Sequence, residues 1–283
     1  MVAYGVSSGG GPGRARERGG DVQLYNSMTG KVEPFAPADG KTVRMYVCGV
    51  TPYDTTHMGH AMTYLTFDVI NRFCQYLGWR VKYVQNVTDI DDDTIRKAKE
   101  VGTDWLTLGN RWTRHFIEDM IALNVRPPDV YPRATDVIPQ MFEIIDALLA
   151  KGHAYVANGS VYFEVATDPH FGQVSGLPKE QWLPIANERG NFPNDPNKRD
   201  PLDFVLWQAQ QPGEPAWDSP WGPGRPRPGD VHRAPHRFRR RGASSMAVDR
   251  TVRIKVQPTT SRTPPRTKYP RSQGKGSAAS SRT

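Results

Sequence analysis

Cysteine, long apolar runs and C-terminal acidic residues are all scarce in this chain. The first two scarcities each exclude a class of protein, and the third indicates how the chain is organised. Cysteine occurs only twice, at Cys48 and Cys74, which excludes a small secreted domain held together by disulfides. No apolar run approaches the length of a membrane helix, and residues 1–20 lack the apolar core of a secretory signal. We therefore expect a cytosolic protein with no membrane partner.

The third scarcity divides the chain in two. Residues 226–283 carry 15 Lys and Arg against 2 Asp and Glu, whereas residues 1–225 carry 22 and 27, so all of the net charge of +8 comes from the tail. Polybasic segments of this composition are typically disordered and bind polyanions weakly. We expect one folded domain over residues 21–226, between a disordered extension at 1–20 and a basic low-complexity tail at 227–283.

Residues 43–60 predict a strand, a loop and the start of a helix. Val43, Met45 and Val47 alternate with polar neighbours, as in a half-buried strand. A loop with Gly49 follows, and an apolar helical pattern starts just after Gly59 and His60. A spacing of four residues places one apolar face of this helix inward, at Leu65, Val69, Phe73 and Leu77. Gly78, which follows, is predicted to cap the C-terminus of the helix.

The predicted helix start favours an anion. Unpaired backbone N–H groups and the positive end of the helix dipole gather there, and Gly59 has no side chain to keep a phosphate away. His57 and His60 flank this glycine and can donate to a phosphate on which charge develops. The alternative is a pair of ordinary surface or capping histidines, and the residues alone leave both interpretations open.

Further along, the pattern predicts a second buried strand from Val81 to Asn86, followed by an acidic run at residues 88–93 that we interpret as helix capping rather than a metal site. Helices are predicted after Asp104 and from Thr135, separated by a proline-rich turn at 124–132. Asn158 and Gly159 predict a tight hairpin turn. Residues 204–207 predict one more strand.

His57-Met58-Gly59-His60 resembles the HIGH motif of class I aminoacyl-tRNA synthetases, and residues 46–54 resemble the preceding segment of cysteinyl-tRNA synthetases. The similarity runs from about residue 24 to 226, through the segments 83–92, 133–135, 198–207, 213–217 and 219–222. The resemblance implies a class I Rossmann-like α/β nucleotide-binding fold with an inserted helical and hairpin region, incomplete here because the second half would begin only at the strand near Phe204.

The resemblance also implies a ligase that joins cysteine to ATP as cysteinyl adenylate and then transfers it to tRNA(Cys). By this resemblance His57 and His60 are catalytic and bind ATP, with magnesium, together with Tyr53 and Gly59. Gly49, Thr51 and Thr88 would bind the substrate cysteine, and Cys48 would be one ligand of a zinc ion that selects the thiol. A monomer is expected.

The chain departs from the family after Gly224-Arg225-Pro226. The family continues there with Gly-Trp-His-Ile-Glu-Cys, further His and Glu zinc ligands and the KMSKS loop, and none of these is present. We hypothesise a frameshift near residues 226–230 and expect little aminoacylation, because one cysteine does not hold zinc tightly. Two alternatives are a cysteine ligase of mycothiol biosynthesis and a non-catalytic fragment that binds nucleic acid through its tail.

Overall fold

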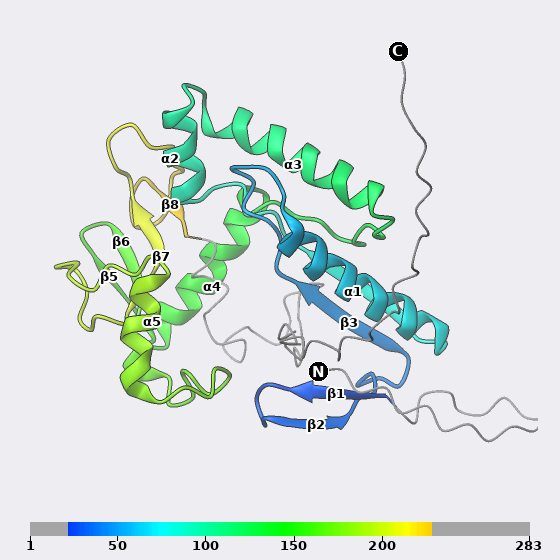
Figure 1. Cartoon of the computed structure of the whole chain (residues 1–283). Helices are drawn as coiled ribbons and strands as arrows, with labels where there is room; N and C mark the ends of the chain where they lie inside the picture. Colours follow the sequence, from blue (N-terminus) through cyan, green and yellow to red (C-terminus); the bar gives the residue numbers. More distant parts are fainter. Residues whose placement is uncertain (1–21, 228–283) are drawn as a thin grey trace, which may run out of the picture.

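The structure is a computed structural model, and it describes residues 22–227. The expectations for residues 1–20 and for the basic tail beyond Arg227 lie outside this range. Strands β1 (Gln23–Asn26) and β2 (Lys31–Pro34) form an antiparallel hairpin. Strands β3 (Thr42–Val47) and β4 (Arg80–Gln85) are parallel, and helix α1 (Met58–Tyr76) connects them. Figure 1 shows α1 beside β3.

Helices and an antiparallel sheet make up the rest of the described chain. The helices are α2 (Asp92–Glu100), α3 (Trp105–Ala122), α4 (Ile138–Ala150) and α5 (Trp182–Glu188), with short 3-10 turns at Thr135–Val137, Val165–Thr167 and Lys179–Gln181. The antiparallel sheet has the order β5 (Ala154–Ala157), β6 (Ser160–Phe163), β7 (Phe204–Ala209) and β8 (Gly224–Pro226). Within residues 22–227, no helix combines the length and apolarity that crossing a membrane requires.

The parallel pair has the expected alternation and forms the first core. Val43, Met45 and Val47 are each less than 9% exposed, and Met45 lies opposite Tyr83 of β4. Tyr64 of α1 and Phe116 of α3 pack against these strands, with their rings edge to face at 5.0 Å. This arrangement of strand, helix and parallel strand is that of an incomplete Rossmann-like α/β fold, as predicted.

A third segment lies parallel to β4 where the sequence predicted only a turn. Isolated parallel bridges join Val84 to Val130 and Val87 to Arg133. Backbone N–H groups of Gln85 and Val87 donate to the carbonyls of Val130 and Pro132 at 3.1 and 2.9 Å. Proline has no backbone N–H to donate to a neighbouring strand, so Pro132 interrupts the β-sheet hydrogen bonding. For this reason the sequence pattern does not indicate a strand here.

Helix α1 buries a different face from the predicted one. Its buried residues are Tyr64, Asp68, Asn71 and Cys74, whereas Val69 is 54% exposed. Asp68 is buried because its carboxylate accepts hydrogen bonds from Arg72 Nε at 2.6 Å and from the Arg126 backbone N–H at 3.0 Å. An apolar pattern cannot reveal a buried face that contains a satisfied carboxylate and amide. The helix also begins at Met58, three residues before the predicted start just after His60.

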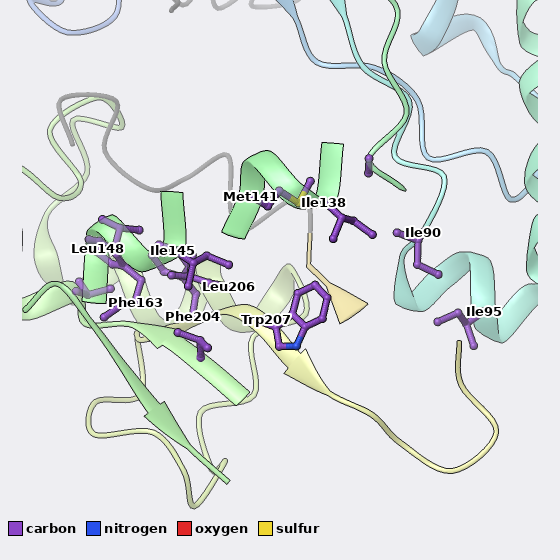
Figure 2. Close-up of a cluster of buried hydrophobic side chains, with 14 residues drawn as sticks. Ile90, Ile95, Ile138, Met141, Ile145, Leu148, Phe163, Phe204, Leu206 and Trp207 are labelled. Carbon is purple, nitrogen blue, oxygen red and sulfur yellow. The ribbon is translucent and has the colours of Figure 1, made fainter. Parts of the chain in front are cut away.

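The second core lies between α4 and the antiparallel sheet (Figure 2). Ile145 of α4, Phe163 of β6 and Leu206 of β7 are fully buried in it, and the rings of Phe163 and Phe204 stack at 5.0 Å. The predicted strand at residues 204–207 exists as part of β7. It pairs with the β5–β6 hairpin and β8, so its expected place at the start of a second nucleotide-binding half was wrong.

Candidate functional site

The two histidines cap helix α1 through their side chains. His57 is the N-cap, and its Nδ1 accepts the Gly59 backbone N–H at 3.0 Å. Nδ1 of His60 accepts the His57 backbone N–H at 3.3 Å, and the two rings stack with centroids 4.0 Å apart. Burial, and then the proximity of His57, lowers the pKa of His60 from its usual value of 6.5. His60 therefore favours the neutral form that accepts this hydrogen bond.

The imidazole of His57 also occupies the space above Gly59. A Cβ atom on Gly59 would lie 2.8 Å from Cε1 of His57. A phosphate approaching the Gly59 backbone would therefore take the place of this ring and accept the N–H that His57 now accepts. His57 and its neighbours Met58 and Gly59 are exposed, so the His57 ring can turn toward solvent.

Thr56, the residue before His57, is hydrogen-bonded to helix α3. The hydroxyl of Thr56 donates to Oδ2 of Asp119, and Nδ1 of His115 lies 3.4 Å from the same oxygen. Asp119 thus ties the loop before α1 to α3. Sequence reasoning did not find this pair, because residues 63 positions apart give no local signal.

A single amide organises the ends of β3 and β4. Oδ1 of Asn86 accepts the Gly49 backbone N–H at 2.8 Å and the Tyr46 hydroxyl at 2.9 Å. Its Nδ2 donates to Oγ1 of Thr88 at 3.0 Å, and Asn86 is only 5% exposed. Sequence reasoning placed Asn86 at the end of a strand but assigned it no role. The structure makes it the link between Gly49 and Thr88.

This network determines which way the Thr88 hydroxyl can act. A backbone N–H can only donate, so its bond to Asn86 fixes Oδ1 on the side of Gly49 and Nδ2 on the side of Thr88. Oγ1 of Thr88 therefore accepts from Asn86, and its own hydrogen is left to donate to a ligand. The Thr88 backbone N–H bonds to the carbonyl of Val50 at 3.0 Å, which joins the two strand ends again.

The acidic run after Thr88 is used in structural contacts. Asp89, 1% exposed, accepts the backbone N–H and the hydroxyl of Thr135 at 3.1 and 2.6 Å. Asp91 caps α2 by accepting the Asp93 backbone N–H at 3.1 Å. Asp92 and Asp93 pair with arginines. The helix-capping interpretation is confirmed for Asp91, whereas Asp89, Asp92 and Asp93 make other structural contacts.

Cys48 follows β3 and is exposed, and its carbonyl accepts the Tyr64 hydroxyl at 3.1 Å. Burial raises the pKa of that phenol, so Tyr64 stays a neutral donor. Among residues 22–227, no three His, Cys, Asp or Glu side chains are arranged to hold a metal ion. A zinc site needs three or four protein ligands, so the described residues do not fit one.

The structure thus groups the predicted site residues in two pairs. Gly49 and Thr88 meet through Asn86, and His57 and His60 stack at the start of α1. Thr51 and Tyr53 lie on the loop from β3 to α1, where the Tyr53 N–H donates to the Thr51 carbonyl at 3.1 Å. Both pairs follow β3 and β4 at their carboxyl ends, where open α/β sheets bind ligands.

Comparison with known proteins gives one matching family. Residues 34–229 match the family described as tRNA synthetases class I (C) catalytic domain. A ligase named L-cysteine:1D-myo-inositol 2-amino-2-deoxy-alpha-D-glucopyranoside ligase, from Thermomonospora curvata, is 51% identical over 205 residues, which are 72% of this chain and 49% of the relative. A cysteine-tRNA ligase from Dehalococcoides mccartyi is 47% identical over 205 residues, 72% of this chain and 44% of the relative.

The chain therefore spans about half the length of the curated relatives it matches. Among solved structures, Mycobacterium tuberculosis methionyl-tRNA synthetase in complex with methionyl-adenylate is 24% identical with a TM-score of 0.40. That match covers 44% of this chain and 25% of the solved chain.

Proposed function

The chain belongs to the family of class I tRNA synthetase (C) catalytic domains, and on this basis we propose that its site activates L-cysteine with ATP. The products are cysteinyl adenylate and pyrophosphate. The observation that carries the proposal is the amide of Asn86, which fixes Gly49 and Thr88 beside each other at the strand ends that precede α1 and α2.

We place the ATP phosphates at the N-terminus of α1, where the helix dipole favours an anion. His57 and His60 would donate to the phosphates, Gly59 would offer its N–H once the His57 ring moves aside, and Tyr53 would lie along the nucleotide. The cysteine carboxylate attacks the α-phosphorus, its oxygen–phosphorus bond forms, and the bond to the pyrophosphate oxygen breaks. ATP is expected to bring magnesium.

We place the cysteine at Gly49, Thr51 and Thr88. The N–H of Gly49 is already bonded to Asn86, so Gly49 would contribute close approach rather than a donor. Thr88 would donate its hydroxyl hydrogen to an acceptor on the substrate. The role of Cys48 as a zinc ligand would need ligands from outside residues 22–227, and no step here depends on it.

For the second step, we propose transfer of the cysteinyl group to tRNA(Cys), in line with the cysteine-tRNA ligases at 47% identity. A second acceptor is an amino sugar, because the ligases named for 2-amino-2-deoxy-glucopyranoside acceptors reach 48% to 51% identity. Both reactions share the adenylation step. A cytosolic protein suits either acceptor.

The test is cysteine-dependent exchange of labelled pyrophosphate into ATP by the purified chain, with serine as the control and zinc supplied. A parallel calorimetric titration uses a non-hydrolysable sulfamoyl analogue of cysteinyl adenylate. We expect weak exchange with cysteine, because the described residues form no zinc site, together with analogue binding. Both should be lower with serine and lost in Thr88→Val. Equal results with serine, or neither exchange nor binding, would overturn the proposal and leave a non-catalytic chain.

A further inference from the structure

Arg225 of β8 is a buried cation. It is 1% exposed, its Nε donates to Oε2 of Glu214 at 2.8 Å, and its Nη2 donates to Oδ1 of Asp92. Arg227 donates to the other oxygen of Asp92 at 2.7 Å. Two arginines and two carboxylates thus form one neutral network, with Asp92 held between both guanidinium groups.

This network costs stability that an apolar cluster would not cost. A buried guanidinium loses its hydration and needs every donor satisfied to recover that loss. Nη1 of Arg225 is buried and makes no hydrogen bond among the described residues. An arginine kept at such a place, with one donor unmet, points to a need for its reach and geometry rather than for stability alone.

The contact joins elements that are distant in sequence. Asp92 is the first residue of α2, four positions after Thr88, while Arg225 pairs with Gln208 of β7 in the antiparallel sheet. Between them, Thr88 bonds to Val50 and Asp89 to Thr135. The loop at residues 88–91 is therefore held at one end by Val50, in the loop after β3, and at the other end by Arg225 through Asp92.

We propose that Arg225 is a positioning residue for the amino-acid site: through Asp92 it sets the loop that carries Thr88, and so couples the antiparallel sheet to cysteine binding. This inference rests on the proposed cysteine activation. Arg225 lies in the segment that closes the antiparallel sheet, so movement of that sheet shifts the position of Thr88.

Asp92→Asn is the most direct variant, because Asp92 is 42% exposed and its loss leaves Arg225 paired with Glu214. Asp93→Asn is the matched control: it removes the same charge from the same helix turn, but its partner Arg96 is 60% exposed. Arg225→Lys keeps the charge and shortens the reach. All three are made in the full chain.

Hydrogen exchange of the backbone amides in residues 87–91 tests the coupling without any turnover. We expect Asp92→Asn and Arg225→Lys to speed exchange there by about fivefold or more, as for loss of a charge-assisted hydrogen bond, with residues 154–163 unchanged. Asp93→Asn should match the wild type. Uniform acceleration in all segments, or none at 87–91, would reduce the network to a structural ion pair and overturn the proposal.

Pyrophosphate exchange then tests the functional half. The KM for cysteine should rise several-fold in Asp92→Asn while the KM for ATP changes less than about twofold. An equal rise in both would contradict a role at Thr88. If the wild-type chain gives no exchange, the proposed cysteine activation fails, whereas the amide measurement still decides whether Arg225 controls the loop.

Discussion

Gly49 lies against the backbone of Asn86 so closely that a Cβ atom on Gly49 would be 1.4 Å from the Asn86 carbonyl oxygen. The Asn86 side chain folds back onto the Gly49 N–H at 2.8 Å. The two strand ends thus touch through backbone atoms, and no side chain can be placed between them. Thr88 and the start of the loop to α1 take their positions from this contact.

Gly49→Ala should therefore be strongly destabilising. Two backbone segments must separate to admit the methyl group, and overpacking of this kind costs about 1–3 kcal/mol or more. Urea unfolding followed by circular dichroism measures the loss. Gly109→Ala in α3 is the control, because its Cβ would lie 3.6 Å from the Asp89 carbonyl, an ordinary contact. A wild-type midpoint for Gly49→Ala would show that the strand ends are not in contact.

Asn86→Asp should separate the two roles of the Asn86 amide, which accepts hydrogen bonds from Gly49 and Tyr46 and donates one to Thr88. A carboxylate still accepts hydrogen bonds from Gly49 and Tyr46 but cannot donate one to Thr88. The Thr88 hydroxyl must then donate its hydrogen to the carboxylate and can no longer donate it to a ligand. We expect a stability loss of about 1 kcal/mol, against about 1–3 kcal/mol for Asn86→Ala, and a larger loss of cysteine binding than of stability. Calorimetric titration with the adenylate analogue, beside urea unfolding, checks this. Unchanged analogue affinity in Asn86→Asp would contradict a donor role for Thr88.

His60 should make stability depend on pH. Its lowered pKa means that the folded state binds a proton less readily than the unfolded state. The contribution of neutral His60 to the free energy of unfolding is therefore complete above the ordinary histidine pKa of 6.5. It is lost as the pH falls from there toward the lower pKa of His60 in the folded state. His60→Asn keeps an acceptor for the His57 N–H and removes the titration. Unfolding free energies at about pH 7.5 and 5.5 should fall more in the wild type than in this variant.

Helix α1 should drive self-association. Met58, Met62, Val69 and Tyr76 share its outer face and are 84%, 62%, 54% and 71% exposed. Apolar stripes of this kind promote contact between copies. The double variant Met62→Gln with Val69→Lys should sediment as a monomer at concentrations where the wild type associates. Ile121→Lys, at an exposed apolar position of α3 outside this stripe, should leave association unchanged. A wild-type monomer would show that the stripe is inert.

Local patterns predicted the elements but not their partners. The alternation of Val43, Met45 and Val47 indicated β3. A helix was predicted after Asp104, and α3 begins there with the Asp104 Oδ1 accepting the Thr107 N–H at 2.8 Å. The burial of Asp68 could not be predicted, because its partner Arg126 is 58 positions away. The pairing of β7 with β6 could not be predicted for the same reason, because these strands are far apart in the sequence.

The candidate site divides in the same way. A histidine pair beside a glycine is visible in the sequence, because its members are three positions apart. Asn86 acts on Gly49 from 37 positions away, and Asp119 acts on Thr56 from 63. Residues that position others are recognised only once the fold brings them together.

The turn at Asn158 and Gly159, with φ angles of 47° and 77°, also bears on the order of folding. Strands β5 and β6 are separated by these two residues, whereas residues 48–79 separate β3 from β4. Short loops close at little entropic cost, so hairpins form within microseconds and parallel pairs form later. We therefore expect the β5–β6 hairpin to form first, as a template for β7, before the strand ends that hold Gly49 and Thr88 meet.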